Sequence, residues 1–344
     1  QNPERHPGVR TQFIAGVLLL VASLVGCGKP APLRVGVMYS LPLGDKGFND
    51  LLRDGILHAK ARYGIGYEYL EFQKTTVDVV GGLRSLAARG CGLVITVGFQ
   101  FSTEVSVVAR EFPAVRFGAI DYQGQPGVVL PPNFVGVRFR EQEGSFLVGA
   151  LAGLMTRTGT VGFVGGMQTS LIRKFEVGYA AGVRRVNPRA RVLSGYAGET
   201  IEAFRNADTG RALARGMFEQ GADIIYHAAG PTGHGVFRAA QEAGRWAIGV
   251  DRDQWDEGLD AATGKSVVLT SMLKRVDRAG EDLVAACLED RFPGGRIVEL
   301  GLKEEGVGYV YDDHNRSLIP DAVVRRVEEI RRDVIAGKIV VPSR

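Results

Sequence analysis

Leu33-Arg-Val-Gly-Val-Met-Tyr39 is a short apolar run that predicts a buried β-strand, and helix signals from Asn49 to Tyr63 follow it directly. The same pair recurs further along, where the apolar run Leu93 to Val97 precedes the helical stretch Thr103 to Glu111. Continuous aliphatic and β-branched runs, without in–out alternation, are typical of parallel strands that helices cover on both faces. The sequence therefore predicts an α/β fold built on parallel sheets.

The strand–helix alternation falls into two series of similar length. The first series has strands predicted at 33–39, 67–72, 93–97 and 115–120. After a helix at 141–155, the second has strands at 160–164, 190–193, 223–227 and 246–250. A chain of 344 residues also exceeds the usual size of a single domain. We therefore predict two doubly wound lobes joined by hinge crossovers, one formed by 33–140 with about 267–300 and the other by 141–266 with about 301–344.

Composition narrows the class of protein. A hydrophobic content of 45% with 23% charged residues excludes a disordered chain and a membrane protein with many spans. The net charge is +4, but the basic residues are spread along the whole chain. Proteins that bind nucleic acid usually concentrate them on one helix or tail, so no nucleic-acid partner is predicted.

The first 27 residues have the pattern of an export signal. Basic residues precede the apolar stretch Phe13 to Gly26, which is too short for an ordinary membrane-spanning helix. The stretch ends in Leu24-Val-Gly-Cys27, which resembles the lipobox of bacterial lipoproteins. That resemblance implies a signal peptide at 1–27, lipidation of Cys27, and a place on the extracytoplasmic face of the cell membrane. An ordinary secretory signal or a short anchor helix remains the alternative.

Polar residues follow the predicted strands where the strands end. Ligands of doubly wound sheets bind at the carboxyl ends of the strands, where the loops converge. The residues placed there are Asp45 and Asn49, Asp121, the Gly230–Gly235 loop, Asp251 and Lys274. This clustering predicts a binding cleft.

Six segments together resemble the basic membrane protein family of ABC-importer receptors, whose best-understood members bind purine nucleosides. They are Gly44-Asp-Lys-Gly-Phe-Asn49, Phe175 to Val183, Ala229 to Phe237, Gly249 to Gln254, Thr270 to Asp277 and Leu300 to Gly308. The chain departs from the family pattern at Pro231, where glycine is usual, and at Gly47, where serine is usual.

The resemblance implies a periplasmic-binding-protein fold of type I, a monomer, and permease and ATPase subunits as partners. Phe48 would stack on a purine ring, with Phe175 or Phe204 on its other face. Asp121 and Asp251 would accept hydrogen bonds from ribose hydroxyls, and Lys274 would face the base or a carboxylate. The complete set of implied ligand-binding residues is Asp45, Phe48, Asn49, Asp121, Phe175, Phe204, Gly230, Gly233, Asp251 and Lys274.

Other functions are weighed against this one. The protein could have the same receptor role with riboflavin or a sugar as its ligand. Alternatives of another class are an enzyme that processes nucleosides and a ligand-sensing regulator, both built on the same fold. No enzymatic activity, cofactor or metal site is predicted. Thr263-Gly-Lys-Ser266 lacks the first glycine of a phosphate-binding loop, and Asp251 to Asp256 lacks the glycine of a calcium loop. Cys91 and Cys287 are predicted as buried thiols, although a disulfide between them stays open.

Overall fold

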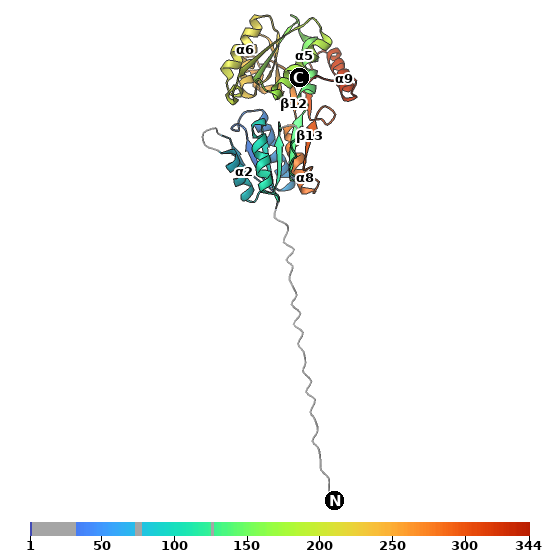
Figure 1. Cartoon of the computed structure of the whole chain (residues 1–344). Helices are drawn as coiled ribbons and strands as arrows, with labels where there is room; N and C mark the ends of the chain where they lie inside the picture. The colour runs from blue at the N-terminus through green and yellow to red at the C-terminus, as the bar shows by residue number, and fades with distance from the viewer. Residues whose placement is uncertain (2–31, 73–77, 125–126) are drawn as a thin grey trace. The chain divides into compact units, whose positions relative to one another are not determined.

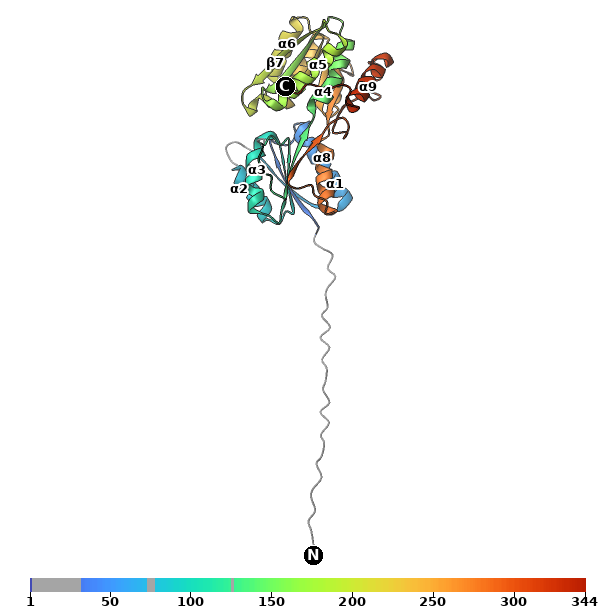
Figure 2. The ribbon, with the colours of Figure 1, turned by 45° about the vertical axis from the view of Figure 1, so that its right-hand side comes forward.

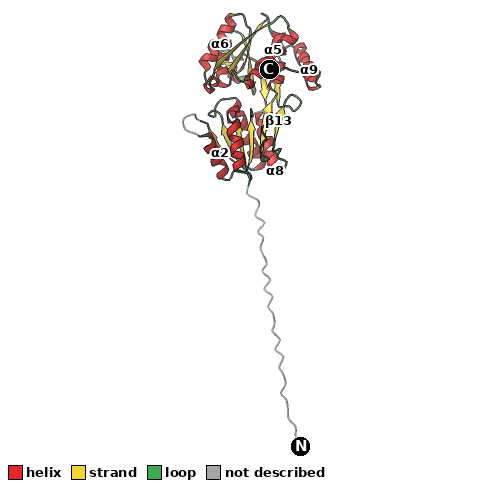
Figure 3. Cartoon of the chain, in the orientation of Figure 1, coloured by secondary structure: helices red, strands yellow, loops and turns green. Residues whose placement is uncertain are grey.

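The computed structural model describes residues 1, 32–72, 78–124 and 127–344 and contains two six-stranded sheets (Figure 1). Helices cover both faces of each sheet, as the alternation of helix and strand in Figure 3 shows. Among the described residues, no helix combines the length and apolar character needed to span a membrane. The predicted lipidation site, Cys27, lies outside the described residues.

The first sheet is entirely parallel, with the strand order β13-β5-β4-β3-β1-β2. Helices α1 and α8 pack together on one face of this sheet, and α2 and α3 on the other (Figure 2). Its elements are β1 (Arg34–Tyr39), α1 (Phe48–Tyr63), β2 (Gly66–Glu71), α2 (Val79–Ala88), β3 (Leu93–Val97), α3 (Ser102–Glu111), β4 (Arg116–Ile120), β5 (Phe134–Phe139), α8 (Val276–Leu288) and β13 (Arg296–Leu300).

The second sheet has the order β14-β12-β9-β8-β6-β7 and is parallel except where β14 joins β12. Its elements are α4 (Glu141–Met155), β6 (Thr160–Met167), α5 (Ser170–Val186), β7 (Arg191–Gly198), α6 (Ala207–Glu219), β8 (Ile224–Ala228), α7 (Gly233–Ala243), β9 (Trp246–Asp251), β12 (Val268–Lys274), β14 (Val307–Tyr309) and α9 (Asp321–Ile335). A small hairpin, β10 (Leu259–Asp260) and β11 (Lys265–Ser266), follows β9. In both sheets the strand order reverses beside the first strand of the lobe, which creates the switch point where ligands bind.

The chain crosses between the lobes three times. It leaves β5 for α4 at Arg140, leaves β12 for α8 at Arg275, and returns after β13. The crossovers are bonded to one another, because the amide of Arg140 donates to the carbonyl of Leu300 at 3.0 Å and the amide of Arg275 to that of Gly306 at 2.8 Å. Figure 1 shows β12 and β13 meeting at this junction.

Several local predictions differ from the structure. β12 pairs with β9 in the second sheet, so placing residues from about 267 onward in the first lobe is wrong for one strand, and the crossing lies after Lys274. Strand β5 was not predicted, because it follows a proline-rich stretch that indicates a loop. A 3₁₀ turn at Ile201–Phe204 precedes α6 and is separate from it. Cys91 and Cys287 are buried and free, so no disulfide joins them.

Helices α4 and α5 approach each other closely through glycine. A Cβ atom at Gly149 would lie 2.2 Å from the carbonyl oxygen of Tyr179, and one at Gly182 would lie 2.1 Å from that of Phe146. These are backbone contacts, which cannot be relieved by rotating a side chain. The hydrogen atom of glycine is therefore what allows the two helices to pack at this distance.

We predict that Gly182→Ala lowers the free energy of unfolding by about 1–3 kcal/mol, because the added methyl group forces α4 and α5 apart. The matched control is Gly216→Ala in α6, where nothing lies within 4 Å of the added Cβ. That control should raise stability by about 0.5–1 kcal/mol through helix propensity alone. Urea unfolding of both variants measures the contrast, and equal effects would contradict the packing argument.

Candidate functional site

A cleft of about 640 Å³, including its mouth, lies between the carboxyl ends of the two sheets. Both lobes contribute to it, and Lys274 lines it at a crossover. The first lobe contributes Ser40, Leu41, Asp45, Phe48, Asn49, Gly98, Phe99, Gln100 and Asp121. The second lobe contributes Leu171, Ile172, Phe175, Ile201, Phe204, Ala228, Ala229, Gly230, Pro231, Val250 and Asp251.

Nine of the ten predicted site residues line this cleft, and the exception is Gly233. Gly233 instead lies against His227, whose ring would be 2.1 Å from an added Cβ. His227 is fully buried and its Nε2 lies 3.1 Å from Oε1 of Gln254. Burial lowers the pKa of His227 to about 3, so it packs as a neutral imidazole beneath the loop.

Asp45 and Asn49 are held by the protein itself. The Asp45 carboxylate accepts hydrogen bonds from the amides of Gly47, Asn49 and Asp50 and from the Asn49 side chain, at 2.9–3.0 Å. Oδ1 of Asn49 in turn accepts from the amide and the hydroxyl of Ser40. These bonds satisfy the free amides at the start of α1 and fix Phe48, its first residue, at the cleft.

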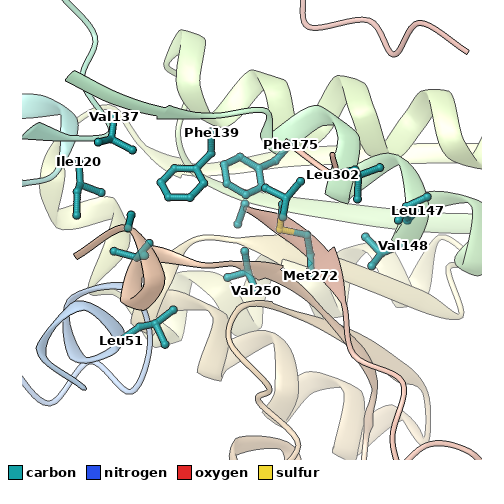
Figure 4. Packing of buried hydrophobic residues seen from close by; sticks show 14 of the residues in the cluster. Leu51, Ile120, Val137, Phe139, Leu147, Val148, Phe175, Val250, Met272 and Leu302 are labelled. Atoms are coloured by element: carbon teal, nitrogen blue, oxygen red, sulfur yellow. The ribbon is translucent and has the colours of Figure 1, made fainter. Parts of the chain in front are cut away.

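Aromatic rings surround the end of the Lys274 side chain. Its Nζ lies 5.0 Å from the ring centre of Phe48, 5.1 Å from that of Phe139 and 5.5 Å from that of Phe175. Figure 4 shows the rings of Phe139 and Phe175 next to each other above Val250. Phe175 is 3% exposed and belongs to the core as well as to the cleft wall.

A buried charge network joins the lobes behind these rings. Nζ of Lys274 lies 2.7 Å from the carboxylate of Asp121 and 3.1 Å from that of Glu141, and Glu141 also pairs with Lys174 at 3.1 Å. Burial disfavours the charge on Lys274, but the surrounding carboxylates outweigh it and hold the pKa of this ammonium above its usual range. Lys274 is therefore a fixed cation at the hinge.

Asp121 and Asp251 end their strands in the left-handed region, with φ of +63° and +70°. Such angles are uncommon outside glycine and cluster at functional sites. The two carboxylates differ in their partners, since Asp121 is paired with Lys274 whereas Asp251 accepts no hydrogen bond from the described residues. Burial raises the pKa of Asp251 to about 7, because its effect is larger than the opposing effect of the nearby Lys274 cation, which lowers the pKa.

The loop that follows β3 also belongs to the cleft, although it is not among the residues predicted from the sequence. Gly98, Phe99 and Gln100 line the cleft, and Nε2 of Gln100 is buried without a partner among the described residues. The strand-end rule would have found this loop, because it begins immediately after Val97. Leu171 and Ile172 were also missed, and nothing in their local pattern separates a cleft wall from an ordinary core.

The family model described as "ABC transporter substrate-binding protein PnrA-like" matches residues 33–344. The chain belongs to this family. It is 38% identical over 289 residues to the CD4+ T-cell-stimulating antigen of Listeria monocytogenes, covering 81% of this chain and 78% of that one. It is 32% identical over 317 residues to the ABC transporter nucleoside-binding protein BmpA of Lactococcus lactis, covering 88% and 86%.

A solved ABC-transporter solute-binding protein from Aeropyrum pernix has the same fold, with a TM-score of 0.77 and 28% identity over 90% of this chain and 94% of that one. The predicted α/β fold with two periplasmic-binding lobes is therefore confirmed, as is the family identified from the motifs. As a member, the protein is a substrate-binding component of an ABC transporter. That role implies a small-molecule ligand and a permease partner, and it suggests an extracytoplasmic location.

We predict that Asp251→Asn stabilises the protein more at pH 8 than at pH 5. The folded-state pKa of about 7 exceeds the ordinary value of about 3.9, so the folded carboxyl takes up a proton before the unfolded one does. Wild-type stability should gain from this group as the pH falls from 8 toward 4, and the variant should not share the gain. Melting temperatures of both proteins across this range test it, and a difference that is independent of pH would contradict it.

Proposed function

We propose that this receptor captures a nucleoside between its lobes and delivers it to the permease. The observation that carries the proposal is the pairing of aromatic walls with free polar groups in one cleft. Phe48, Phe175 and Phe204 can enclose a flat heteroaromatic ring, while the Asp251 carboxyl and Nε2 of Gln100 have no hydrogen-bond partner among the described residues. The nucleoside-binding name of the Lactococcus lactis relative supports the same ligand class.

Each part of a nucleoside has a matching group in the cleft. Stacking on an aromatic side chain contributes about 1–3 kcal/mol per base and tolerates different bases. The Asp251 carboxylate suits a pair of ribose hydroxyls, because an ionised carboxylate only accepts hydrogen bonds. The Gln100 amide can donate to an acceptor on the ligand, and Lys274 is already engaged by two carboxylates.

The charge of the lining argues against phosphorylated ligands. In the part of the chain that the structure describes, the carboxylates of Asp45, Asp121 and Asp251 line the cleft, and Lys274 is the single cation there. The ammonium group is 2% exposed and is bound by Asp121. A phosphate would therefore be repelled by this lining, so we expect nucleosides to be bound and nucleotides rejected.

Ligand contacts from both lobes would favour the closed arrangement. The three bonded crossovers form the hinge, and the ligand shifts the population toward closure by its differential affinity for the two arrangements. The closed receptor is the form that we expect to dock on the permease.

A thermal-shift screen tests the ligand class. A nucleoside at a hundredfold over its dissociation constant should stabilise the protein by about 2.7 kcal/mol, whereas ribose, free bases and nucleotides should not. Asp251→Ala should weaken nucleoside binding about tenfold or more, because a charge-assisted hydrogen bond is lost. Asp256→Ala, in the same loop but exposed, is the matched control and should leave affinity unchanged. A rise in melting temperature with riboflavin or a sugar alone would show that the ligand is not a nucleoside, and it would leave the receptor role unchanged.

We also propose that Cys27 carries the lipid anchor. Two acyl chains on one residue hold a protein stably at a membrane. Expressed in a bacterium with radiolabelled palmitate, the chain should incorporate label and fractionate with membranes. Cys27→Ser should lose both properties, while Cys91→Ser should keep them. Label retained by Cys27→Ser would refute the assignment.

A further inference from the structure

We propose that Asp253, Asp312 and His314 form a binding site for a divalent transition-metal ion of the Zn²⁺ type. Asp253 lies in the loop after β9, and the other two residues lie after β14. One donor atom from each residue lies within 4.8 Å of the other two. None of these residues fills an assigned role in the ligand cleft, because none of them lines it.

The three donor atoms converge without bonding to one another. Nδ1 of His314 lies 3.8 Å from the Asp253 carboxylate and 3.9 Å from that of Asp312, both beyond hydrogen-bond distance. Around a tetrahedral zinc ion with bonds of about 2.0–2.1 Å, neighbouring donors are about 3.3 Å apart. An approach of roughly half an ångström would bring Nδ1 of His314 to this spacing from each of the two carboxylates.

Local contacts hold each side chain in this orientation. The His314 ring stacks on Trp255, with ring centres 4.5 Å apart and planes 18° apart. One oxygen of Asp253 accepts from the amide of Trp255, and one oxygen of Asp312 accepts from the amide of His314. On Asp253 the oxygen nearest the His314 ring is the other one, whereas on Asp312 it is the same oxygen that accepts from the amide, which keeps a second lone pair for an ion. The side chains are 37–52% exposed, so an ion can reach them.

The charge balance of the cluster favours a cation. Asp253 and Asp312 place two carboxylates around one imidazole nitrogen, and a divalent ion between them would be attracted to both.

The donor set selects the kind of ion. Imidazole suits zinc, copper and nickel, whereas magnesium and calcium take oxygen ligands almost exclusively. One nitrogen and two carboxylates leave room for a water molecule at a fourth position of zinc. We therefore expect Zn²⁺ to bind far more tightly than Ca²⁺ or Mg²⁺.

Trp255 provides a local readout. Trp246 and Trp255 are the two tryptophans of the chain, so Trp246→Phe leaves Trp255 as its single indole. In this background, without an affinity tag, a paramagnetic ion such as Cu²⁺ at His314 should quench the fluorescence in a saturable 1:1 titration. Zn²⁺ should then displace the Cu²⁺ and restore the emission, while Ca²⁺ should not.

Matched variants decide between a site and a nonspecific acidic surface. His314→Ala and Asp312→Asn should each weaken Zn²⁺ competition by about tenfold or more, because a ligand is lost. Asp313→Asn, an adjacent carboxylate whose side chain is 93% exposed, should change it less than about twofold. Quenching unaltered by His314→Ala, or Ca²⁺ competing as well as Zn²⁺, would overturn the proposal. Unchanged melting temperatures show that the variants fold.

Discussion

The buried Lys274 cation is the interaction on which the arrangement of the two lobes depends. A charged amine that is 2% exposed is costly to bury unless it is paired. Here the compensation comes from both lobes, through Asp121 at the end of β4 and Glu141 at the start of α4. Because Lys274 itself ends β12, the pairing holds together two of the three crossovers.

The same cation shapes the cleft wall. Phe48, Phe139 and Phe175 place their rings around Nζ, so the aromatic surface and the charge network stabilise each other. Lys274 therefore supports the aromatic wall of the cleft, and its ammonium group is already bonded to carboxylates instead of being free to donate to a ligand. Asp251, which has no such partner and sits at a strained left-handed position, is the polar group left for a ligand.

Much of the fold could be predicted from local pattern. Leu93 to Val97 is buried at every position, as its unbroken apolar run predicts, and polar side chains do follow the strands. The family motifs also located most of the cleft. The wrong lobe for β12 has a physical cause, since the partner of a strand is set by long-range register. β12 carries the same kind of apolar sequence whichever sheet it joins, and its pairing with β9 cannot be read from it.

By itself, the amino-acid sequence determined that the sheets are mainly parallel, where most of the buried central strands end, and which polar and aromatic residues follow them. These properties are local, because hydrophobic periodicity and turn chemistry depend on neighbouring residues. Only the tertiary structure decided which polar groups are already bonded, such as Asp45 and Asn49, and which are free, such as Asp251 and Gln100. It alone brought Asp253 beside Asp312 and His314. Hydrogen-bond partners and clusters of distant residues form when loops that are far apart in the sequence come together in the fold, and a local sequence pattern does not contain that information.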